Sequence, residues 1–257
     1  MFVREEFHMV YHHTRLTSFI TKGDKLMDYV FAPEKIPSVP VRGSNLQYAV
    51  SRIFCVGRNY AAHAREMGFD PDREPPFYFT KPANALVMSG ATIPYALGTQ
   101  NLHYEMELVI AISKPAFRVS VENAQDYIYG YACGLDMTRR DLQIKSREIG
   151  RPWDFGKAFE NSAIMTSLVP KSEVGEINSG NIDLQVNGVM KQKADLKDMI
   201  WNVSEIIANL SEYYHLNTGD LIYTGTPEGV GPVVAGDHLL GAIDQLGTLE
   251  LHIGPAE

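Results

Sequence analysis

The sequence predicts a β-dominated α+β fold with a few peripheral helices. Residues 104–113 alternate in polarity and are rich in valine and isoleucine, and residues 247–253 alternate again, which is typical of β-strands. Asn187-Gly188 lies in the middle of a strand-like run at 182–190, and this dipeptide is a strong signal for a hairpin turn. Only residues 199–214 carry a long helical stripe of apolar side chains.

From residue 52 onward, segments with a clear secondary-structure preference alternate with turn signals. In chain order we expect a strand at 52–56, a short helix at 59–67, strands at 104–113 and 127–135, a hairpin at 182–190, a long helix at 199–214, and strands at 221–223 and 247–253. Gly57 ends the first strand, and Gly68 ends the short helix, where a glycine is the usual C-terminal residue.

The N-terminal part of the chain differs from the rest. Residues 1–27 show no sustained periodicity and carry three histidines, so we expect a poorly ordered extension there. Prolines at 33, 37 and 40 predict an extended lead-in segment over residues 28–49. Because the remainder has no internal repeat or low-complexity linker, residues 50–257 are predicted to be a single domain.

Composition narrows the class of protein and its partners. The 257 residues include 31 acidic and 23 basic ones, and the net charge of −8 disfavours binding to nucleic acid or to an anionic membrane. The sequence shows no long apolar stretch and no secretory signal. Cys55 and Cys133 lie in apolar runs and are expected to be buried thiols, which fits a reducing compartment. We therefore expect a cytoplasmic protein that binds neither nucleic acid nor membrane.

Three carboxylates are candidates for a metal site. Glu105 and Glu107 flank Met106 in the predicted strand 104–113, so the period of two places both carboxylates on one face. Asp136 follows an apolar run and would supply a third oxygen ligand, which suits Mg²⁺ or Mn²⁺. Two other interpretations remain open: the glutamates face solvent on an edge strand, or Asp136 caps a helix.

A histidine and a glutamate on the predicted helix 59–67 are candidates for acid–base chemistry. His63 and Glu66 are three residues apart, so they lie on one helical face. A carboxylate beside an imidazole orients it and raises its basicity, which makes a general base. The alternative is an ordinary exposed pair on a surface helix.

Two more features have a functional and an ordinary interpretation. Lys157, between aromatic and glycine residues, is either a partly desolvated ammonium that holds a carboxylate or enolate oxygen, or a lysine whose head extends into solvent. The glycine-rich segment 225–231 presents backbone N–H groups that can hold a carboxylate, or is a plain connecting turn. It lacks the lysine ending of a phosphate-binding loop, which argues against a nucleotide.

Taken in chain order, six segments between residues 50 and 253 resemble the fumarylacetoacetate hydrolase family. They are Cys55-Val56-Gly57-Arg58-Asn59-Tyr60 with the His63/Glu66 helix, Phe79-Thr80-Lys81-Pro82, His103-Tyr104-Glu105-Met106-Glu107, Gly134-Leu135-Asp136-Met137-Thr138, Lys157-Ala158-Phe159, and Tyr223-Thr224 with the 225–231 turn. The run 58–68 and the lead-in 37–43 are most similar to the bacterial fumarylpyruvate hydrolases of that family.

The resemblance implies a mixed β-roll, a homodimer, and one Mg²⁺ or Mn²⁺ per chain. It assigns roles to ten residues of this sequence. The metal ligands would be Glu105, Glu107 and Asp136, the catalytic residues His63, Glu66 and Lys157, and the substrate-binding residues Arg58, Arg140, Gln143 and Thr226. For a distal carboxylate of the substrate, Arg58, Arg65 and Arg151 are the candidates.

The resemblance also implies an activity on a small keto acid. It indicates hydrolysis of the C–C bond of an acylpyruvate, with fumarylpyruvate giving fumarate and pyruvate in aromatic (gentisate) catabolism. The same scaffold also suits an oxaloacetate-type decarboxylase or a hydroxymuconate-type isomerase. A non-catalytic, metal-stabilised binding protein is the remaining alternative, and the intact carboxylates, dyad and lysine argue against it.

Overall fold

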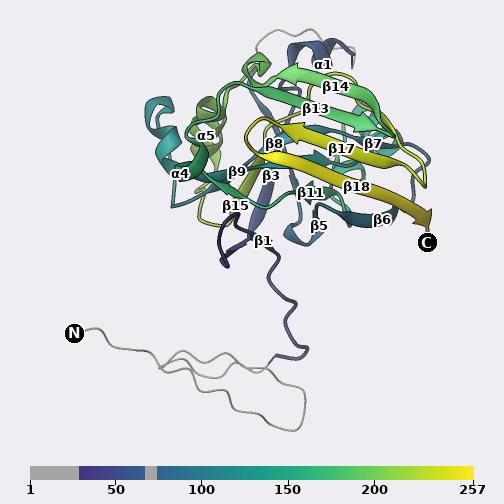
Figure 1. The fold of residues 1–257 in the computed structure, drawn as a ribbon, viewed down its shortest axis with the longest axis horizontal. Coiled ribbons are helices and arrows are strands. Elements are labelled where there is room, and N and C mark those ends of the chain that lie inside the picture. Colours follow the sequence, from purple (N-terminus) through teal and green to yellow (C-terminus); the bar gives the residue numbers. More distant parts are fainter. Residues whose placement is uncertain (1–28, 67–73) are drawn as a thin grey trace. The chain divides into compact units, whose positions relative to one another are not determined.

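The computed structural model describes residues 29–66 and 74–257 (Figure 1). The chain divides into two units, Met1–Ile36 and Pro37–Glu257. The described part of the first unit, residues 29–36, has no helix or strand. The expected extension 1–27 and the predicted helix end at Gly68 lie outside the described residues. Every helix and strand among the described residues belongs to the second unit.

The largest element of this unit is a mixed eight-stranded sheet. Its strands, in spatial order, are β4 (Phe77–Lys81), β3 (Arg52–Gly57), β15 (Asp220–Tyr223), β8 (Met106–Ile112), β9 (Ile128–Asp136), β11 (Ala163–Met165) and β5 (Leu86–Met88), with β12 (Val169–Pro170) also paired to β9. The pairs β15–β3 and β11–β5 are parallel and the others are antiparallel. The late strand β15 therefore lies near the middle of the sheet, between two early ones.

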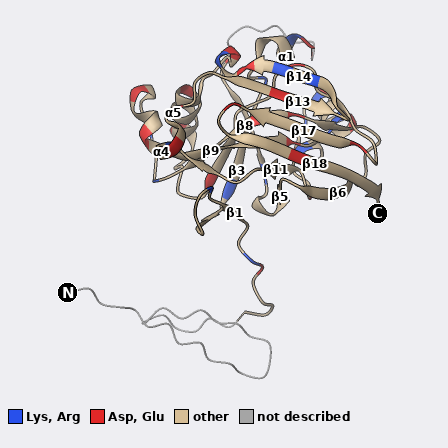
Figure 2. Ribbon diagram, in the orientation of Figure 1, with Lys and Arg blue, Asp and Glu red and all other residues tan. Residues whose placement is uncertain are grey.

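A second, five-stranded sheet covers one face of the first. Its order is β14 (Val189–Asp195), β13 (Asn181–Val186), β17 (His238–Ile243), β18 (Gly247–Ala256) and β6 (Ala91–Tyr95). Figure 1 shows β13, β17 and β18 lying across β8 and β9. Leu108 and Ile110 of β8 and Leu184 of β13 belong to one buried apolar cluster, so the core lies between the two sheets. On its other face the sheet carries charged residues, including the lysines of β14 (Figure 2).

Smaller elements complete the unit. Strands β1 (Ser38–Pro40) and β2 (Gln47–Ala49) pair with each other, and β7 (Leu102–Tyr104) lies between β10 (Thr138–Arg139) and β16 (Gly231–Pro232). The helices are α1 (Ala61–Glu66), α2 (Arg140–Glu148), α3 (Asp154–Lys157), α4 (Lys171–Val174) and α5 (Val203–Tyr213), with three short 3₁₀ turns at Ala83–Ala85, Val121–Tyr127 and Leu196–Asp198. No helix among the described residues is long and apolar enough to cross a membrane.

The predicted fold class is confirmed, and most predicted elements form close to their expected limits. Several boundaries were wrong. The second strand of the hairpin expected at 182–190 continues to Asp195. The strand expected at 104–113 is interrupted at Glu105, which separates β7 from β8. The helix expected from residue 199 begins at Val203, because Asn202 and Glu205 form a capping box that fixes its start. Both cysteines are buried and unpaired, as predicted.

Candidate metal and catalytic site

Three acidic side chains converge at one end of the β8–β9 pair. Glu107 is on β8, Glu105 immediately precedes β8, and Asp136 is the last residue of β9. The antiparallel register and a 2.9 Å hydrogen bond from the Asp136 N–H to the Glu105 carbonyl bring them together. One oxygen of each lies within 4.8 Å of the others, and all three side chains are buried. The solvent-facing and helix-cap interpretations are therefore wrong.

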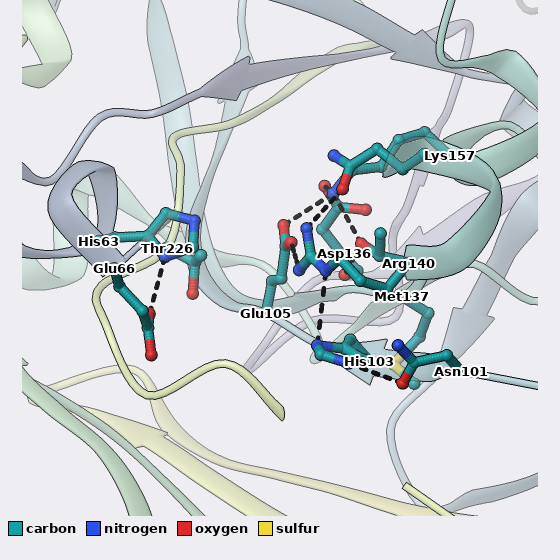
Figure 3. Close-up of polar contacts among 12 residues, drawn as sticks. His63, Glu66, Asn101, His103, Glu105, Asp136, Met137, Arg140, Lys157 and Thr226 are labelled. Atoms are coloured by element: carbon teal, nitrogen blue, oxygen red, sulfur yellow. Dashed lines mark hydrogen bonds and ion pairs between the residues drawn. The ribbon is translucent and has the colours of Figure 1, made fainter. Parts of the chain in front are cut away.

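Two buried lysines and an arginine neutralise part of this acidic cluster. Figure 3 shows Lys157 and Arg140 beside Glu105 and Asp136. The Lys157 Nζ lies 2.7 Å from Oε2 of Glu105 and 2.7 Å from Oδ2 of Asp136, so its head does not extend into solvent. The Lys81 Nζ lies 2.8 Å from Oδ1 of Asp136. Arg140 pairs with Glu105 through Nη2. Asp136 thus has two cationic partners, and Glu105 also has two.

Glu107 differs from the other two carboxylates. Among the described residues it has no cationic ion-pair partner, and its Oε2 accepts a 2.8 Å hydrogen bond from the N–H of Gly225. Burial raises the pKa of Glu107, and the charges of Asp136 and Glu105 raise it further. Burial also opposes ionisation of Glu105, but the charges of Lys157 and Arg140 prevail and lower its pKa. A divalent cation fits this cluster, because it would supply the positive charge that Glu107 lacks through three hard oxygen ligands.

His63 and Glu66 form a partly buried pair on α1. The His63 ring is buried, and its Nδ1 lies 3.2 Å from Oε2 of Glu66. The same carboxylate accepts a hydrogen bond from the Gly229 N–H, at 3.1 Å to Oε2 and 3.2 Å to Oε1. The bond to His63 is the main cause of a lowered pKa of Glu66. Because an ionised carboxylate only accepts hydrogen bonds, Nδ1 carries the proton and Nε2 is left as a base.

The glycine-rich turn at 225–231 does hold carboxylates, and they belong to the chain itself. Its N–H groups at Gly225 and Gly229 bind Glu107 and Glu66. Gly225 has φ of 95°, and a Cβ there would lie 2.7 Å from the Cβ of Asn59. Glycine is therefore required at this position both for backbone conformation and for packing.

A cavity with about 470 Å³ of empty volume, open to solvent, joins the carboxylates to His63. Eight of the ten residues predicted from the sequence line it, and the other two, Glu66 and Asp136, contact His63 and Lys157. Arg65 and Arg151 are not among its lining residues. The lining also contains residues that the sequence did not indicate: Phe79, Ile144, Arg147 and Trp153.

Local packing explains how two of the lining side chains are positioned. Gly156 lets α3 approach α2 closely, since a Cβ there would lie 2.8 Å from the Cβ of Gln143, and Lys157 follows directly. Arg140 begins α2, and its Nη1 donates a 2.5 Å hydrogen bond to the Gln143 carbonyl oxygen Oε1. Arg140 also contacts His103, whose pKa is lowered to about 4 by burial first and by Arg140 next.

The sequence indicates no role for two buried residues near the cavity. Lys81 lies in one of the segments that resemble the family, and its burial depends on the ion pair with Asp136. Gln192 on β14 accepts the N–H of Met106 at 3.0 Å and donates to Oγ1 of Thr226 at 2.8 Å. It thereby links the strand of the carboxylates to the glycine-rich turn. Only Lys81 carried a signal, as a lysine at the end of an aromatic strand-like run.

Comparison with known proteins agrees with this geometry. The family model described as fumarylacetoacetate (FAA) hydrolase C-terminal matches residues 52–253. A fumarylpyruvate hydrolase from a Ralstonia species is 56% identical over 188 residues, which are 73% of this chain and 97% of that protein. An oxaloacetate tautomerase from Escherichia coli is 38% identical over 206 residues, covering 79% of this chain and 93% of that protein.

A solved structure is similar over nearly the whole fold. The crystal structure of fumarylpyruvate hydrolase from Pseudomonas aeruginosa, in complex with Mn²⁺ and pyruvate, has a TM-score of 0.87 and 51% identity. The similarity covers 89% of this chain and 100% of that one. From the family model, the relatives and the shared fold together, this chain belongs to the fumarylacetoacetate hydrolase family.

Proposed function

We propose that this chain is a metal-dependent hydrolase that cleaves the C–C bond of an acylpyruvate, with fumarylpyruvate as substrate and fumarate and pyruvate as products. The observation that carries the proposal is that the buried Glu105, Glu107 and Asp136 cluster and the His63–Glu66 pair meet at one cavity. The 56% identical relative named fumarylpyruvate hydrolase supports the choice of substrate. The Mn²⁺ and pyruvate in the similar crystal structure support the choice of product and metal.

One Mg²⁺ or Mn²⁺ per chain would be held by the three carboxylates. When bound, it supplies positive charge that stabilises the keto-acid oxygens as an enolate. The chain itself surrounds the same position with Lys157, Arg140 and Gln143, which hold the keto-acid end of the substrate together with Thr226. All four side chains are buried, and electrostatic interactions of buried groups are stronger than those in bulk water.

His63 is the proposed base. Its Nε2 takes a proton from a water molecule, whose oxygen attacks the distal carbonyl carbon of the substrate. The C–C bond then breaks, fumarate leaves with the new oxygen, and the electron pair of the broken bond forms the enolate of pyruvate. The proton taken up by Nε2 of His63 is then passed to the enolate carbon, which gives pyruvate and returns His63 to its starting state. The positive charge of Lys157 stabilises the enolate while it exists. Glu66 keeps the proton of His63 on Nδ1 throughout.

Arg58 and Arg147 would hold the distal carboxylate of fumarylpyruvate. Both line the cavity, and they are close enough for the charge of Arg147 to contribute to a lowered pKa of Arg58, whose main cause is burial. Two like charges at one cavity wall are favourable when an anion lies between them. Phe79 and Trp153, with ring centroids 5.8 Å apart, form an apolar wall for the planar fumaryl group. Arg147 is thus added to the substrate-binding residues, in preference to Arg65 and Arg151.

The similarity to an oxaloacetate tautomerase supports a second candidate, proton transfer on oxaloacetate without C–C cleavage. The two activities are separated by their products. With Mn²⁺ present, the purified chain is expected to remove the enol absorbance of fumarylpyruvate and to release equal amounts of fumarate and pyruvate, and EDTA should stop this. Inertness toward fumarylpyruvate, combined with metal-dependent enol–keto exchange of oxaloacetate or with CO₂ release from it, would overturn the proposal.

The quaternary state and the compartment are part of the same proposal. We propose a cytoplasmic homodimer, supported by the family membership and by the two unpaired buried cysteines. Light scattering coupled to size exclusion is expected to give twice the mass of the 28.7 kDa chain. A monomer mass at all concentrations would contradict the dimer.

A further inference from the structure

We propose a second metal site, formed by His238, Glu250 and His252 on the outer face of the five-stranded sheet, that takes a first-row transition-metal ion such as Zn²⁺. One ligand atom of each residue lies within 4.8 Å of the other two. All three side chains are partly exposed, so the site is accessible from solvent. It belongs to a different sheet from the carboxylates of the cavity.

The strand register explains why these three residues come together. His238 of β17 and His252 of β18 are direct cross-strand partners. Glu250 precedes His252 by two residues on the same strand, and successive side chains of a strand alternate between faces, so it shares their face. Three chelating side chains are thus fixed by a single antiparallel pair.

Both imidazole nitrogens lie beside the carboxylate of Glu250. The Nε2 of His238 lies 2.8 Å, and the Nε2 of His252 3.4 Å, from the same oxygen of Glu250, its Oε1. The two imidazole rings are stacked, with centroids 4.5 Å apart and an interplanar angle of 13°. For tetrahedral zinc with bonds of about 2.0–2.2 Å, ligand atoms are about 3.4 Å apart. The ligand atoms of His252 and Glu250 already have this spacing, and those of His238 and Glu250 are closer by about 0.6 Å.

The backbone under these side chains is well supported. The N–H of Glu250 donates to Oγ of Ser89 at 2.8 Å, and its carbonyl accepts from the N–H of Gly90 at 2.8 Å. The N–H of His238 donates to Oδ1 of Asn187 at 2.9 Å. Because β18 pairs with strands on both sides, the ligands sit on a fixed surface and lose little backbone freedom on binding a metal.

The donor atoms determine which ion each site prefers. Two imidazole nitrogens and one carboxylate suit Zn²⁺, Co²⁺, Ni²⁺ or Cu²⁺, whereas three carboxylates suit Mg²⁺ or Mn²⁺. Three protein ligands leave a position for water, as the exposure of the site also allows. Bound metal would join β17 to β18 and stabilise the folded chain by mass action.

The test uses the full chain with excess Mg²⁺, which occupies the carboxylates of the cavity. The chain is titrated with Co²⁺, which is followed by its visible absorption, and with Zn²⁺, which is followed by calorimetry. Each titration is expected to show one equivalent of metal bound per chain through nitrogen ligands. His238→Gln, His252→Gln and Glu250→Gln should each lose it, while His215→Gln, a change at an exposed histidine outside the cluster, should keep it. Zn²⁺ should raise the melting temperature of the wild type and of His215→Gln only.

Two results would overturn the proposal. The first is the absence of any such equivalent in the wild type. The second is an equivalent that persists in His238→Gln and His252→Gln, since it would then belong to other histidines such as His12 and His13. Circular dichroism of each variant shows whether the fold is retained, and the exposed positions make retention the expected outcome. The Glu250→Gln variant keeps both imidazoles and so tests the carboxylate alone.

Discussion

The backbone N–H of Gly225 donates a 2.8 Å hydrogen bond to Oε2 of Glu107, which is 118 residues earlier in the chain. Four residues further along the same turn, the N–H of Gly229 donates to the carboxylate of Glu66. One short segment therefore supports both the acidic cluster and the histidine–glutamate pair. A change in the turn should disturb metal binding and proton transfer together.

Gly225→Ala tests this support. At φ of 95° an alanine is strained, and its Cβ would lie 2.7 Å from the Cβ of Asn59 and 3.1 Å from the carbonyl oxygen of Val56. We expect a loss of about 1–3 kcal/mol in the free energy of unfolding, measured by urea denaturation, and weaker Mn²⁺ binding. Gly236→Ala is the matched control, because it has φ of 96° and no atom within 4 Å of its Cβ. Equal losses in the two variants would mean that backbone strain alone, and not the contact with Asn59, is responsible.

His63→Ala should lower kcat for fumarylpyruvate by about 10²–10⁴-fold, the usual contribution of a general base. Mn²⁺ affinity, measured by calorimetry, should stay nearly unchanged, because His63 does not belong to the group of three carboxylates that would hold the metal. His215→Ala, at an exposed histidine, should leave both quantities as in the wild type. A parallel loss of turnover and metal affinity in His63→Ala would contradict its role as the base.

Glu107→Gln should abolish Mn²⁺ binding without destabilising the metal-free protein. The substitution keeps the size of the side chain and removes a buried charge that has no cationic partner among the described residues and faces Asp136 and Glu105. Thermal melts are expected to show a metal-free midpoint at or above that of the wild type and no further rise with Mn²⁺. The exposed Glu148→Gln is the control. A normal Mn²⁺-dependent rise would remove Glu107 from the ligands.

Lys157→Met should destabilise the fold as well as reduce turnover. The ammonium lies between Glu105 and Asp136, and its removal leaves buried carboxylates with one cation fewer. Breaking a buried ion pair from one side costs about 3–5 kcal/mol. Lys145→Met, an exposed change on α2, should cost little. Denaturant melts of both variants check this, and a stability loss in Lys157→Met no larger than in Lys145→Met would refute the charge argument.

Arg147→Met should change substrate selectivity. A charge-assisted hydrogen bond contributes about 1.5–3 kcal/mol, so kcat/KM for fumarylpyruvate should fall by about 10–150-fold. Acetylpyruvate has no distal carboxylate, so its kcat/KM should hardly change. Arg151→Met, an exposed arginine that does not line the cavity, is the control. If both substrates lose activity equally, Arg147 does not recognise the distal carboxylate, whereas inertness of the wild type toward both would instead refute the proposed reaction.

Local patterns predicted a large part of the fold. Neighbouring residues in the sequence were enough to predict the apolar strands β3, β8 and β9, the hairpin at Asn187-Gly188 and the apolar stripe of α5. Strands such as β4 and β17 were missed, because their polarity pattern is weak and pairing with distant strands stabilises them. The break at Glu105 was missed as well. It separates β7, which pairs with β10 and β16, from β8, which pairs with β9 and β15, and these partner strands are distant in sequence.

Some residues of the candidate site could be predicted from the sequence and others could not. The carboxylates and the His63–Glu66 pair had a spacing that suggests chemistry, although only the resemblance to a family selected one interpretation. The cationic partners were harder to predict. Lys81 is buried because it meets Asp136, 55 residues away in sequence, and Arg147 reaches the cavity from the last turn of α2. Such contacts depend on tertiary packing, which cannot be predicted from a short stretch of sequence.

The middle position of β15 in the eight-stranded sheet has a consequence for how the protein is made. During synthesis, β3 and β8 emerge long before residues 220–223, so the strand that joins them is still absent. Until then both strands keep an unpaired edge, which is prone to wrong pairing with another chain. Such pairing between distant segments also folds slowly. A nascent chain that stops before Asp220 should therefore be inactive and prone to aggregate, even though it already contains every carboxylate of the cavity.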